Sequence, residues 1–233
     1  MEILGFIPAR AGSKGIPKKN LALVNCKPLI SYTIAAAQAS CVTRILVSTD
    51  SEEIAQVSRA LGADVPFLRP AALAGDTALI SDAILDALAR LREKENYAPE
   101  VIVLLQPTSP LRQARYIDAA VELFLKNDVD SVISISDPIE HPALMVYWPQ
   151  PTAMTFLMEG KYATMPRQAY PACSKINGML YVFSPKTLAV YNNIFGKKVL
   201  PYQTPQADSI DIDSPGEMEI AAALIQYRQR QIT

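Results

Sequence analysis

The alternation of short apolar runs with amphipathic segments constrains the fold of this chain more than any other feature. Four apolar or β-branched runs, each followed by a polar or proline-containing loop, have the length of buried strands: residues 2–7, 44–49, 100–106 and 131–136. Four intervening segments carry apolar residues at three- and four-residue spacing, as amphipathic helices do: residues 29–40, 51–61, 77–95 and 112–127. This alternation predicts an α/β fold, a three-layer sandwich with a mostly parallel central sheet. Ligands in such sheets bind beyond the carboxyl ends of the strands, so we expect the chemistry in the loops that follow them.

The alternation breaks down between residues 138 and 170, where prolines and methionines surround the only tryptophan, Trp148. Long loops without regular structure are uncommon in compact domains unless they have a function. We therefore predict a single domain of residues 1–233 with 138–170 inserted as an arm that packs its aromatic side chains on a second copy, giving a homodimer. Packing of the arm on its own domain is the alternative. Strands are expected again at 179–183 and 198–201, before a last helix at 214–230, where Ser214, Pro215 and Glu217 form a capping-box start.

Bulk composition excludes several classes of partner. A net charge of -1 leaves no electrostatic footprint for nucleic acid or for an anionic membrane surface. Three cysteines without CxxC spacing and a single histidine argue against a disulfide framework and a zinc site. Since no apolar stretch is long enough to span a bilayer or to form a signal-peptide core, we expect a cytoplasmic protein.

A strongly basic loop follows the first expected strand. The stretch IPARAGSKGIPKKN, residues 7–20, holds Arg10, Lys14, Lys18 and Lys19 and no acidic residue. Two glycines, Gly12 and Gly15, allow backbone amides to approach an anion closely. One cation near an oxyanion is worth about 4 kcal/mol at 4 Å if the effective dielectric constant is about 20. The loop therefore predicts a triphosphate site, although neither GxxxxGK[ST] nor GxGxxG is present.

An acidic pair lies near the other end of the chain, in SIDIDSPGE. In an extended strand Asp211 and Asp213 would point to one side, while Ile210 and Ile212 would point to the core. Two carboxylates on one face repel each other unless a cation lies between them, and Mg²⁺ commonly binds one or two carboxylates together with substrate phosphates. We predict that this pair holds Mg²⁺; alternatively, Asp213 only helps the following helix to begin.

The stretch IPARAGSKGIPKKNL followed by KPLI closely resembles the N-terminal signature of the CMP-sialic acid synthetases, the acylneuraminate cytidylyltransferases. Further matches continue to the last helix. The resemblance implies a nucleotidyltransferase fold of Rossmann-like type and Asp211 and Asp213 as metal ligands. It implies catalysis by Arg10, Lys14, Lys19 and Asp211. The nucleotide-binding residues that it implies are Arg10, Gly12, Ser13, Lys14, Lys19 and Asn20 for the phosphate side, with Arg69 and the backbone at Ala78 for cytosine.

Two further motifs concern the acceptor sugar. The resemblance places Gln106 of LLQPTSPLR, and Arg167, Lys175 and Asn177 of PRQAYPACSKINGMLYVF, near it. An ulosonic acid carries a carboxylate, which calls for an arginine or a lysine within reach. Purely structural interpretations stay open for neighbouring residues, namely Asp76 or Thr77 as a helix cap, Ser109-Pro110 as a helix start, and Asn177-Gly178 as a hairpin turn.

The sequence departs from the family pattern in two places. Some relatives have a lysine behind the pair His141-Pro142, where this chain has Ala143 and Leu144. Leu79 and Ile80 replace a serine pair of some relatives beside the expected cytosine site. The first departure leaves the identity of the sugar open, and the second removes a hydroxyl contact to the base.

Together these features predict that the hydroxyl of a nine-carbon ulosonic acid of the sialic type attacks the α-phosphate of CTP, giving a CMP-sugar and pyrophosphate. Asp211 or a metal-bound water would take the proton. The alternatives are a synthetase for a diamino nonulosonic acid of the legionaminic or pseudaminic type, or for 3-deoxy-manno-octulosonate. A glycosyltransferase that uses nucleotide sugars and a catalytically silent nucleotide-binding module are more distant.

Overall fold

The central sheet of the computed structural model, which describes residues 1–232, has the strand order β10-β6-β9-β5-β1-β4. Its strands are β1 Ile3–Pro8, β4 Arg44–Ser48, β5 Val101–Leu104, β6 Ser131–Ser136, β9 Lys175–Phe183 and β10 Val199–Gln203. β1 pairs in parallel with β4 and β5, and β10 with β6, whereas β9 runs antiparallel to β5 and β6. The predicted α/β fold with a mostly parallel sheet is confirmed. The chain passes from β4 back across β1 to β5, so the crevice beyond the ends of β1 and β5 is a switch point where ligands bind.

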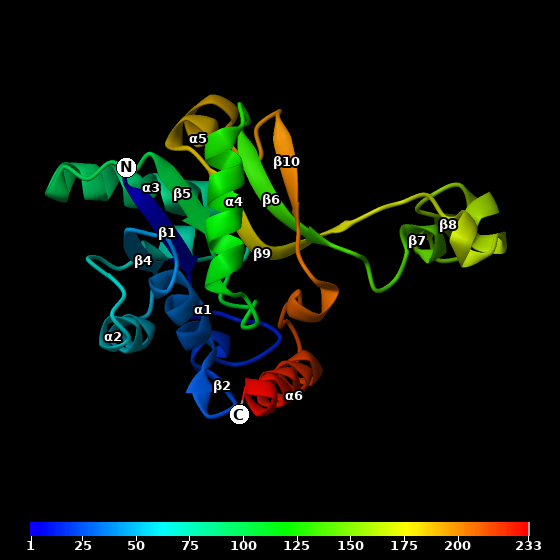
Figure 1. Cartoon of the computed structure of the whole chain (residues 1–233), viewed down its shortest axis with the longest axis horizontal. Coiled ribbons are helices and arrows are strands. Elements are labelled where there is room, and N and C mark those ends of the chain that lie inside the picture. The colour runs from blue at the N-terminus through cyan, green and yellow to red at the C-terminus, as the bar shows by residue number, and fades with distance from the viewer. Residues whose placement is uncertain (233) are drawn as a thin grey trace.

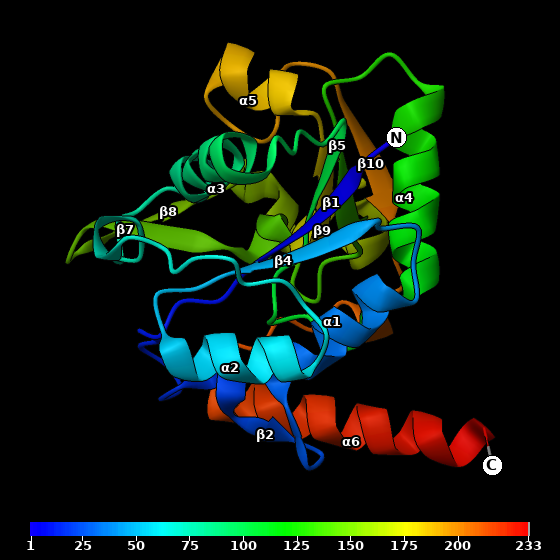
Figure 2. The same ribbon diagram turned by 90° about the vertical axis from the view of Figure 1, so that its left-hand side faces the viewer.

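Helices cover both faces of the sheet (Figure 2). On one face α1 Leu29–Gln38, α2 Glu52–Ala60 and α4 Ala114–Lys126 pack on the odd-numbered side chains of β1 and β5, such as Ile7 and Val103. On the other face α3 Ile80–Glu95 and α5 Pro185–Tyr191 pack on even-numbered side chains, such as Phe6 and Leu104. Each strand thus buries both of its faces, which is why these strands are continuous apolar runs.

The last helix, α6 Pro215–Ile232, lies beyond the carboxyl ends of the strands with the small hairpin of β2 Leu23–Val24 and β3 Lys27–Pro28. A third apolar cluster, containing Ile212 and Ile225, joins them. The predicted capping box is confirmed, because the Glu217 carboxylate accepts from the Ser214 amide at 2.7 Å and the Ser214 hydroxyl accepts from the Glu217 amide at 3.4 Å. None of the described helices is both long and apolar enough to cross a membrane.

Residues between β6 and β9 form an arm that projects away from the sheet (Figure 1). It contains a separate two-stranded sheet of β7 Val146–Gln150 and β8 Ala153–Phe156 and short 3₁₀ helices at Pro142–Leu144, Gly160–Thr164 and Arg167–Ala169. Further 3₁₀ turns lie outside the arm, at Lys19–Leu21, Ala71–Leu73 and Gln206–Asp208. Large apolar side chains of the arm are exposed, with Trp148 at 70%. The arm therefore does not bury its aromatic residues on its own domain.

Four local expectations are wrong. α3 begins at Ile80 with Leu79 as its N-cap, so neither Asp76 nor Thr77 caps it, and α4 begins at Ala114 rather than behind Ser109. Asn177 and Gly178 lie inside β9, at a register shift opposite β6, instead of in a hairpin turn. Residues 209–213 form no strand, although Ile212 is fully buried and the two flanking aspartates point away from it into a cavity, as alternation requires.

Candidate functional site

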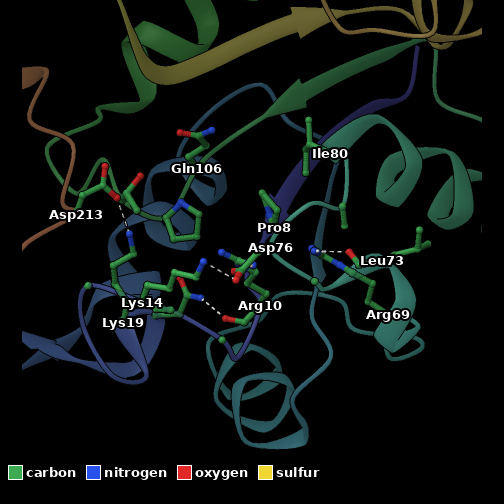
Figure 3. Close-up of a pocket in the computed structure, with 18 of the residues that line it drawn as sticks. Pro8, Arg10, Lys14, Lys19, Arg69, Leu73, Asp76, Ile80, Gln106 and Asp213 are labelled. Carbon is green, nitrogen blue, oxygen red and sulfur yellow. Dashed lines mark hydrogen bonds and ion pairs between the residues drawn. The ribbon is translucent and has the colours of Figure 1, made fainter. Parts of the chain in front are cut away.

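A cavity of about 640 Å³ opens at the carboxyl ends of β1 and β5. Its walls come from the basic loop, the segment before α3, the loop after β5 and the acidic segment before α6 (Figure 3). The lining includes every residue predicted for catalysis, for the nucleotide and for the metal, and one predicted for the sugar: Arg10, Gly12, Ser13, Lys14, Lys19, Asn20, Arg69, Ala78, Gln106, Asp211 and Asp213. Segments about two hundred residues apart in the chain thus meet in one place.

Hydrogen bonds within the protein fix the basic loop. The buried Asn20 side chain donates to the carbonyl oxygen of Arg10 at 3.0 Å, which joins the two ends of the loop. The amide of Ala11 donates to the carboxylate of Asp50, directly after β4, at 2.8 Å. Asn20, which the resemblance implied to lie near the nucleotide, thus supports the loop that carries the cations.

Two of the cations share one carboxylate. Arg10 Nη1 and Lys14 Nζ each lie 2.8 Å from an oxygen of Asp76 (Figure 3). Lys14, and next Arg10, lowers the pKa of the Asp76 carboxyl. Because this carboxylate lies where the two cations converge, it marks a position suited to a phosphate oxygen. Our reading of the sequence considered Asp76 only as a helix cap and missed this contact.

The third cation joins the basic loop to the acidic segment. Lys19 Nζ donates to Asp213 Oδ1 and to the carbonyl oxygen of Ile212, both at 2.9 Å. Gly15 also belongs to this contact, since a Cβ at residue 15 would lie 2.2 Å from the carbonyl oxygen of Asp213. No larger residue fits there unless one of the two segments moves. These contacts bring the basic loop and the acidic pair together at one side of the cavity.

Asp211 lies deeper than Asp213. Its Oδ1 atom is buried and has no hydrogen-bond partner among the described residues. Burial raises the pKa of its carboxyl, while a hydrogen bond from Thr108 partly opposes the shift. A buried carboxylate oxygen without a partner is costly unless a cation or another ligand satisfies it. Asp211 and Asp213 therefore fit a metal-binding pair, although the described residues contain no cluster of three or more His, Cys, Asp or Glu that could hold a metal by protein ligands alone.

The Arg69 side chain is mostly committed to the protein. Its guanidinium donates to the hydroxyl and the carbonyl oxygen of Ser48, at 3.0 and 2.6 Å, and to the carbonyl oxygen of Leu73 at 3.5 Å. Burial lowers the pKa of this arginine. The contacts fix the segment that leads to Ala78 against the end of β4, so Arg69 shapes this wall of the cavity.

The residues predicted for the sugar are separated. Gln106 lies in the cavity described above, and Lys175 lines a second cavity that also contains Asp211. Arg167 lies instead in a neighbouring hollow at the base of the arm, with His141 and Tyr170.

Asn177 does not fit direct contact with a ligand. Its side chain is only 2% exposed, and its amide bonds the hydroxyls of Ser134, Thr204 and Ser209. The neighbouring Gly178 does face the site, because a Cβ there would lie 2.7 Å from Gln106 Oε1. Gly178 has a φ of 74°, which glycine adopts without strain.

Arg112 is a buried cation that our reading of the sequence did not single out. Its guanidinium donates to the carbonyl oxygen of Met179 at 2.7 Å, to the Thr33 hydroxyl at 2.8 Å and to the carbonyl oxygen of Gln106. Burial lowers its pKa. The signal was present at the end of LLQPTSPLR, where an arginine follows a largely apolar stretch. Arg112 holds the backbone that carries Gln106.

A family model described as cytidylyltransferase matches residues 4–228. The CMP-N,N'-diacetyllegionaminic acid synthase of Legionella pneumophila is 36% identical and aligns over 100% of both chains. The N-acylneuraminate cytidylyltransferase of Escherichia coli is 31% identical over 99% of this chain and 54% of its own length.

A solved structure of a CMP:2-keto-3-deoxy-manno-octonic acid synthetase complexed with CTP superposes with a TM-score of 0.72. The match covers 98% of this chain and 100% of that one at 16% sequence identity. At this identity the likeness concerns the fold alone.

Proposed function

The chain belongs to the cytidylyltransferase family, and we propose from this premise that it joins CTP to a nonulosonic acid, releasing pyrophosphate and a CMP-sugar. One observation carries the proposal. The basic loop and the acidic pair face each other across a single cavity and are joined by the bond between Lys19 and Asp213. A magnesium nucleotide needs both signs of charge in this arrangement.

Arg10 and Lys14 neutralise the part of the triphosphate that leaves as pyrophosphate. They are the cations that converge on Asp76, so a phosphate group that takes the place of this carboxylate meets both. The gross Coulomb attraction of each such contact is about 4 kcal/mol at 4 Å and an effective dielectric constant of about 20, and solvent screens part of it because both cations are exposed. Ser13, Gly12 and the neighbouring amides line the same wall. Catalysis of this kind consists mainly of positioning and charge neutralisation.

Arg69 and Ala78 form the wall that we assign to cytosine. Arg69 fixes this wall through Ser48 and Leu73, and the backbone of Ala78 lines the cavity. Backbone amides and carbonyls at a fixed wall can hydrogen-bond the edge of a base. Side-chain hydroxyls are then not needed, and Leu79 and Ile80, which line the same cavity, have none.

Asp211 and Asp213 are the residues that would hold Mg²⁺. The unpartnered Oδ1 of Asp211 and the exposed carboxylate of Asp213 fit this ion, which prefers oxygen ligands and binds phosphates at the same time. When bound, the ion supplies neutralisation of the charge on the phosphates. Asp211 also lies at the boundary of the two cavities and is the side chain that we assign to receive the proton of the acceptor hydroxyl.

The acceptor enters from the second cavity, where Lys175 offers a cation to its carboxylate. Gln106 lies on the nucleotide side of the same boundary, and its carbonyl oxygen is held by Arg112. We assign Gln106 to an acceptor hydroxyl. Arg167 reaches the acceptor only if the arm of a partner or a movement of its own arm brings it in, since it lies in another hollow here.

Two acceptors stay open for the proposed reaction, and the first is a sialic-type acid, in line with the Escherichia coli relative. A diamino nonulosonic acid is the second, and the Legionella relative, aligned over the full length of both chains, supports it.

We also propose a homodimer formed through the arm, because its apolar side chains are uncovered in one copy.

Release of pyrophosphate tests the proposal. Purified protein with Mg²⁺ should release it from CTP only when a nonulosonic acid is present, and UTP or ATP should support a much lower rate. Turnover of UTP with a hexose 1-phosphate, together with no turnover of CTP with any nonulosonic acid, would reject the assignment.

A further inference from the structure

The second cavity, of about 860 Å³, has a polar end and an apolar wall that the proposed reaction leaves unexplained. It lies between the base of the arm, the start of β9 and helix α6 (Figure 1 shows these elements). Its polar end contains Asp211 and Lys175, and Asp211 also lines the nucleotide cavity. A molecule that fills the second cavity therefore has one end beside the nucleotide. This placement identifies the occupant as the acceptor sugar. The inference therefore rests on the proposed function, which requires such an acceptor.

Apolar side chains from two separate elements form the wall. Ile220 and Leu224 belong to one face of α6, three and seven residues after Glu217, which lines the same cavity. Ile139 and Met145 face them from the base of the arm. Ile139 is 75% exposed, Ile220 55% and Met145 40%, so these three side chains are largely uncovered by the described residues 1–232.

Several polar side chains of the cavity are already satisfied by protein partners. The Asp137 carboxylate accepts from Gln203 at 3.2 Å, the Ser209 hydroxyl donates to the carbonyl oxygen of Pro205 at 2.8 Å, and the Glu217 carboxylate accepts from the start of α6. An acceptor hydroxyl that points at the wall would lose its water and gain little in return. A methyl group at the same place would bury apolar surface on both sides.

We propose that this wall, formed by Ile139, Met145, Ile220 and Leu224, selects a nonulosonic acid that carries a second acylamido group where a sialic acid carries a hydroxyl. The carboxylate of the acid lies at Lys175, its reacting hydroxyl lies at Asp211, and the methyl of the second acyl group packs on Ile220 and Met145. Some relatives have a lysine behind the His141-Pro142 pair, where this chain has Ala143 and Leu144, so these two positions offer no cation to sugar hydroxyls. The wall thus decides between the two acceptors left open above.

The experiment compares kcat/KM for N,N'-diacetyllegionaminic acid and for N-acetylneuraminic acid at saturating CTP. The native protein should prefer the first acid by at least about tenfold, because an apolar pocket gives about that much for a single methylene. The two acids differ by more than this, since the first carries an acetamido group in place of one hydroxyl and lacks a second hydroxyl. Ile220→Asn should reduce this preference by about tenfold, mainly through a lower rate with the diacetylated acid, while the KM for CTP stays unchanged.

Val190→Asn is the matched control, because Val190 is also a β-branched residue exposed on a helix, at 59%, but it belongs to α5 outside the cavity. It should leave the preference unchanged. Met145→Gln, in the arm outside α6, should also reduce the preference between the two acids, and it replaces Ile220→Asn if that variant fails to fold. Equal rates with the two acids in the native protein, or a preference that survives both substitutions, would overturn the inference.

Two other outcomes have separate meanings. If neither acid is converted, the proposed function fails and the inference with it. If both are converted equally and Ile220→Asn changes only the sedimentation coefficient, the wall is an interface between copies; the proposed function then stands and the inference is wrong.

Discussion

Asp76 occupies the place between Arg10 and Lys14 that a phosphate needs, at 2.8 Å from each. Binding of the triphosphate must break both ion pairs. Exposed ion pairs of this kind are each worth up to about 1 kcal/mol. We therefore expect Asp76→Asn to bind CTP about twofold to tenfold more tightly, because the cations are then free beforehand.

Isothermal titration calorimetry at low salt measures this change. Asp128→Asn is the control, since Asp128 is an exposed aspartate whose partner, Lys198, lies away from the cavity. Weaker binding of CTP by Asp76→Asn would instead assign Asp76 a direct part in holding the nucleotide.

Asp211 gives the second prediction at this scale. Asp211→Asn keeps the size of the side chain and removes its charge, so Mg²⁺-dependent turnover should fall by at least about a hundredfold, since even partners of metal ligands contribute up to that much. The initial rate of pyrophosphate release, measured over a range of Mg²⁺ concentrations, tests this effect. A variant as active as Asp128→Asn would show that the Asp211 carboxylate is idle.

The basic loop and the acidic pair were predictable from residue types, and the family resemblance implied the other predicted side chains of the cavity, but neither gave all of their contacts. Arg69 was placed correctly beside the cavity, yet its bonds to Ser48 depend on the end of β4, which lies near it only in the folded protein. Asn177 was expected to touch the sugar, but its amide is bonded inside the protein because Ser134 and Thr204 lie beside it. Hydrogen-bond partners distant in sequence are set by strand pairing, which the local pattern does not contain.

At the scale of elements, the start of α6 controls the acidic segment. Glu217 Oε2 accepts from the amides of Asp213 and Ser214, at 2.8 and 2.7 Å. The cap therefore fixes the backbone of a residue that we assign to the metal. The loss of a helix cap costs about 1 kcal/mol of unfolding free energy in typical cases.

This contact predicts a pH dependence. The bond from the amide of Asp213 lowers the pKa of Glu217 in the folded state. A carboxyl whose pKa is lower in the folded state stabilises the protein above its unfolded pKa, about 4.3 for glutamate, and the contribution is lost as the pH falls through the folded value. Glu217→Gln should therefore lower the free energy of unfolding at neutral pH. Below about pH 4 the free energies of unfolding of the variant and the native protein should become more alike. Urea denaturation at several pH values measures these free energies of unfolding. If the variant and the native protein differ by the same amount at every pH, the stabilising role given to the Glu217 carboxylate is wrong.

Most elements were predictable because helix and strand periods are local. The order of the sheet and the antiparallel direction of β9 were not, because these features arise from pairing between distant strands. The error at Asn177-Gly178 has the same origin. This dipeptide is typical of a hairpin turn, but here Gly178 serves the close approach of β9 to Gln106.

At the scale of the whole molecule, the arm exposes apolar side chains that a single copy does not cover. Trp148 on β7 and Met154 on β8 are examples, and we expect them to lie in a dimer interface. Trp148→Lys should weaken self-association by about tenfold or more, because buried tryptophans contribute strongly to interfaces. Leu125→Lys is the control, since Leu125 is exposed on α4 outside the arm.

Sedimentation velocity at micromolar concentration tests this prediction. The native protein and Leu125→Lys should sediment as dimers, and Trp148→Lys should dissociate. A native protein that is monomeric under these conditions would remove the assigned role of the arm. Arg167 could not be placed from the sequence, because the fold of the arm puts it beside His141 and Tyr170 in a separate hollow at the base of the arm.

In the proposed reaction, two adjoining cavities that share Asp211 bring the α-phosphate of CTP to the hydroxyl of a nonulosonic acid. Phosphorus nuclear magnetic resonance of a single mixture of the protein, Mg²⁺, CTP and the acid tests it most directly. Attack at the α-phosphate should replace the resonances of CTP with those of pyrophosphate and of one new phosphodiester, and the mixture with Asp211→Asn should keep the spectrum of CTP. Formation of CDP and a phosphorylated sugar, or unchanged CTP with every nonulosonic acid offered to the native protein, would contradict the account.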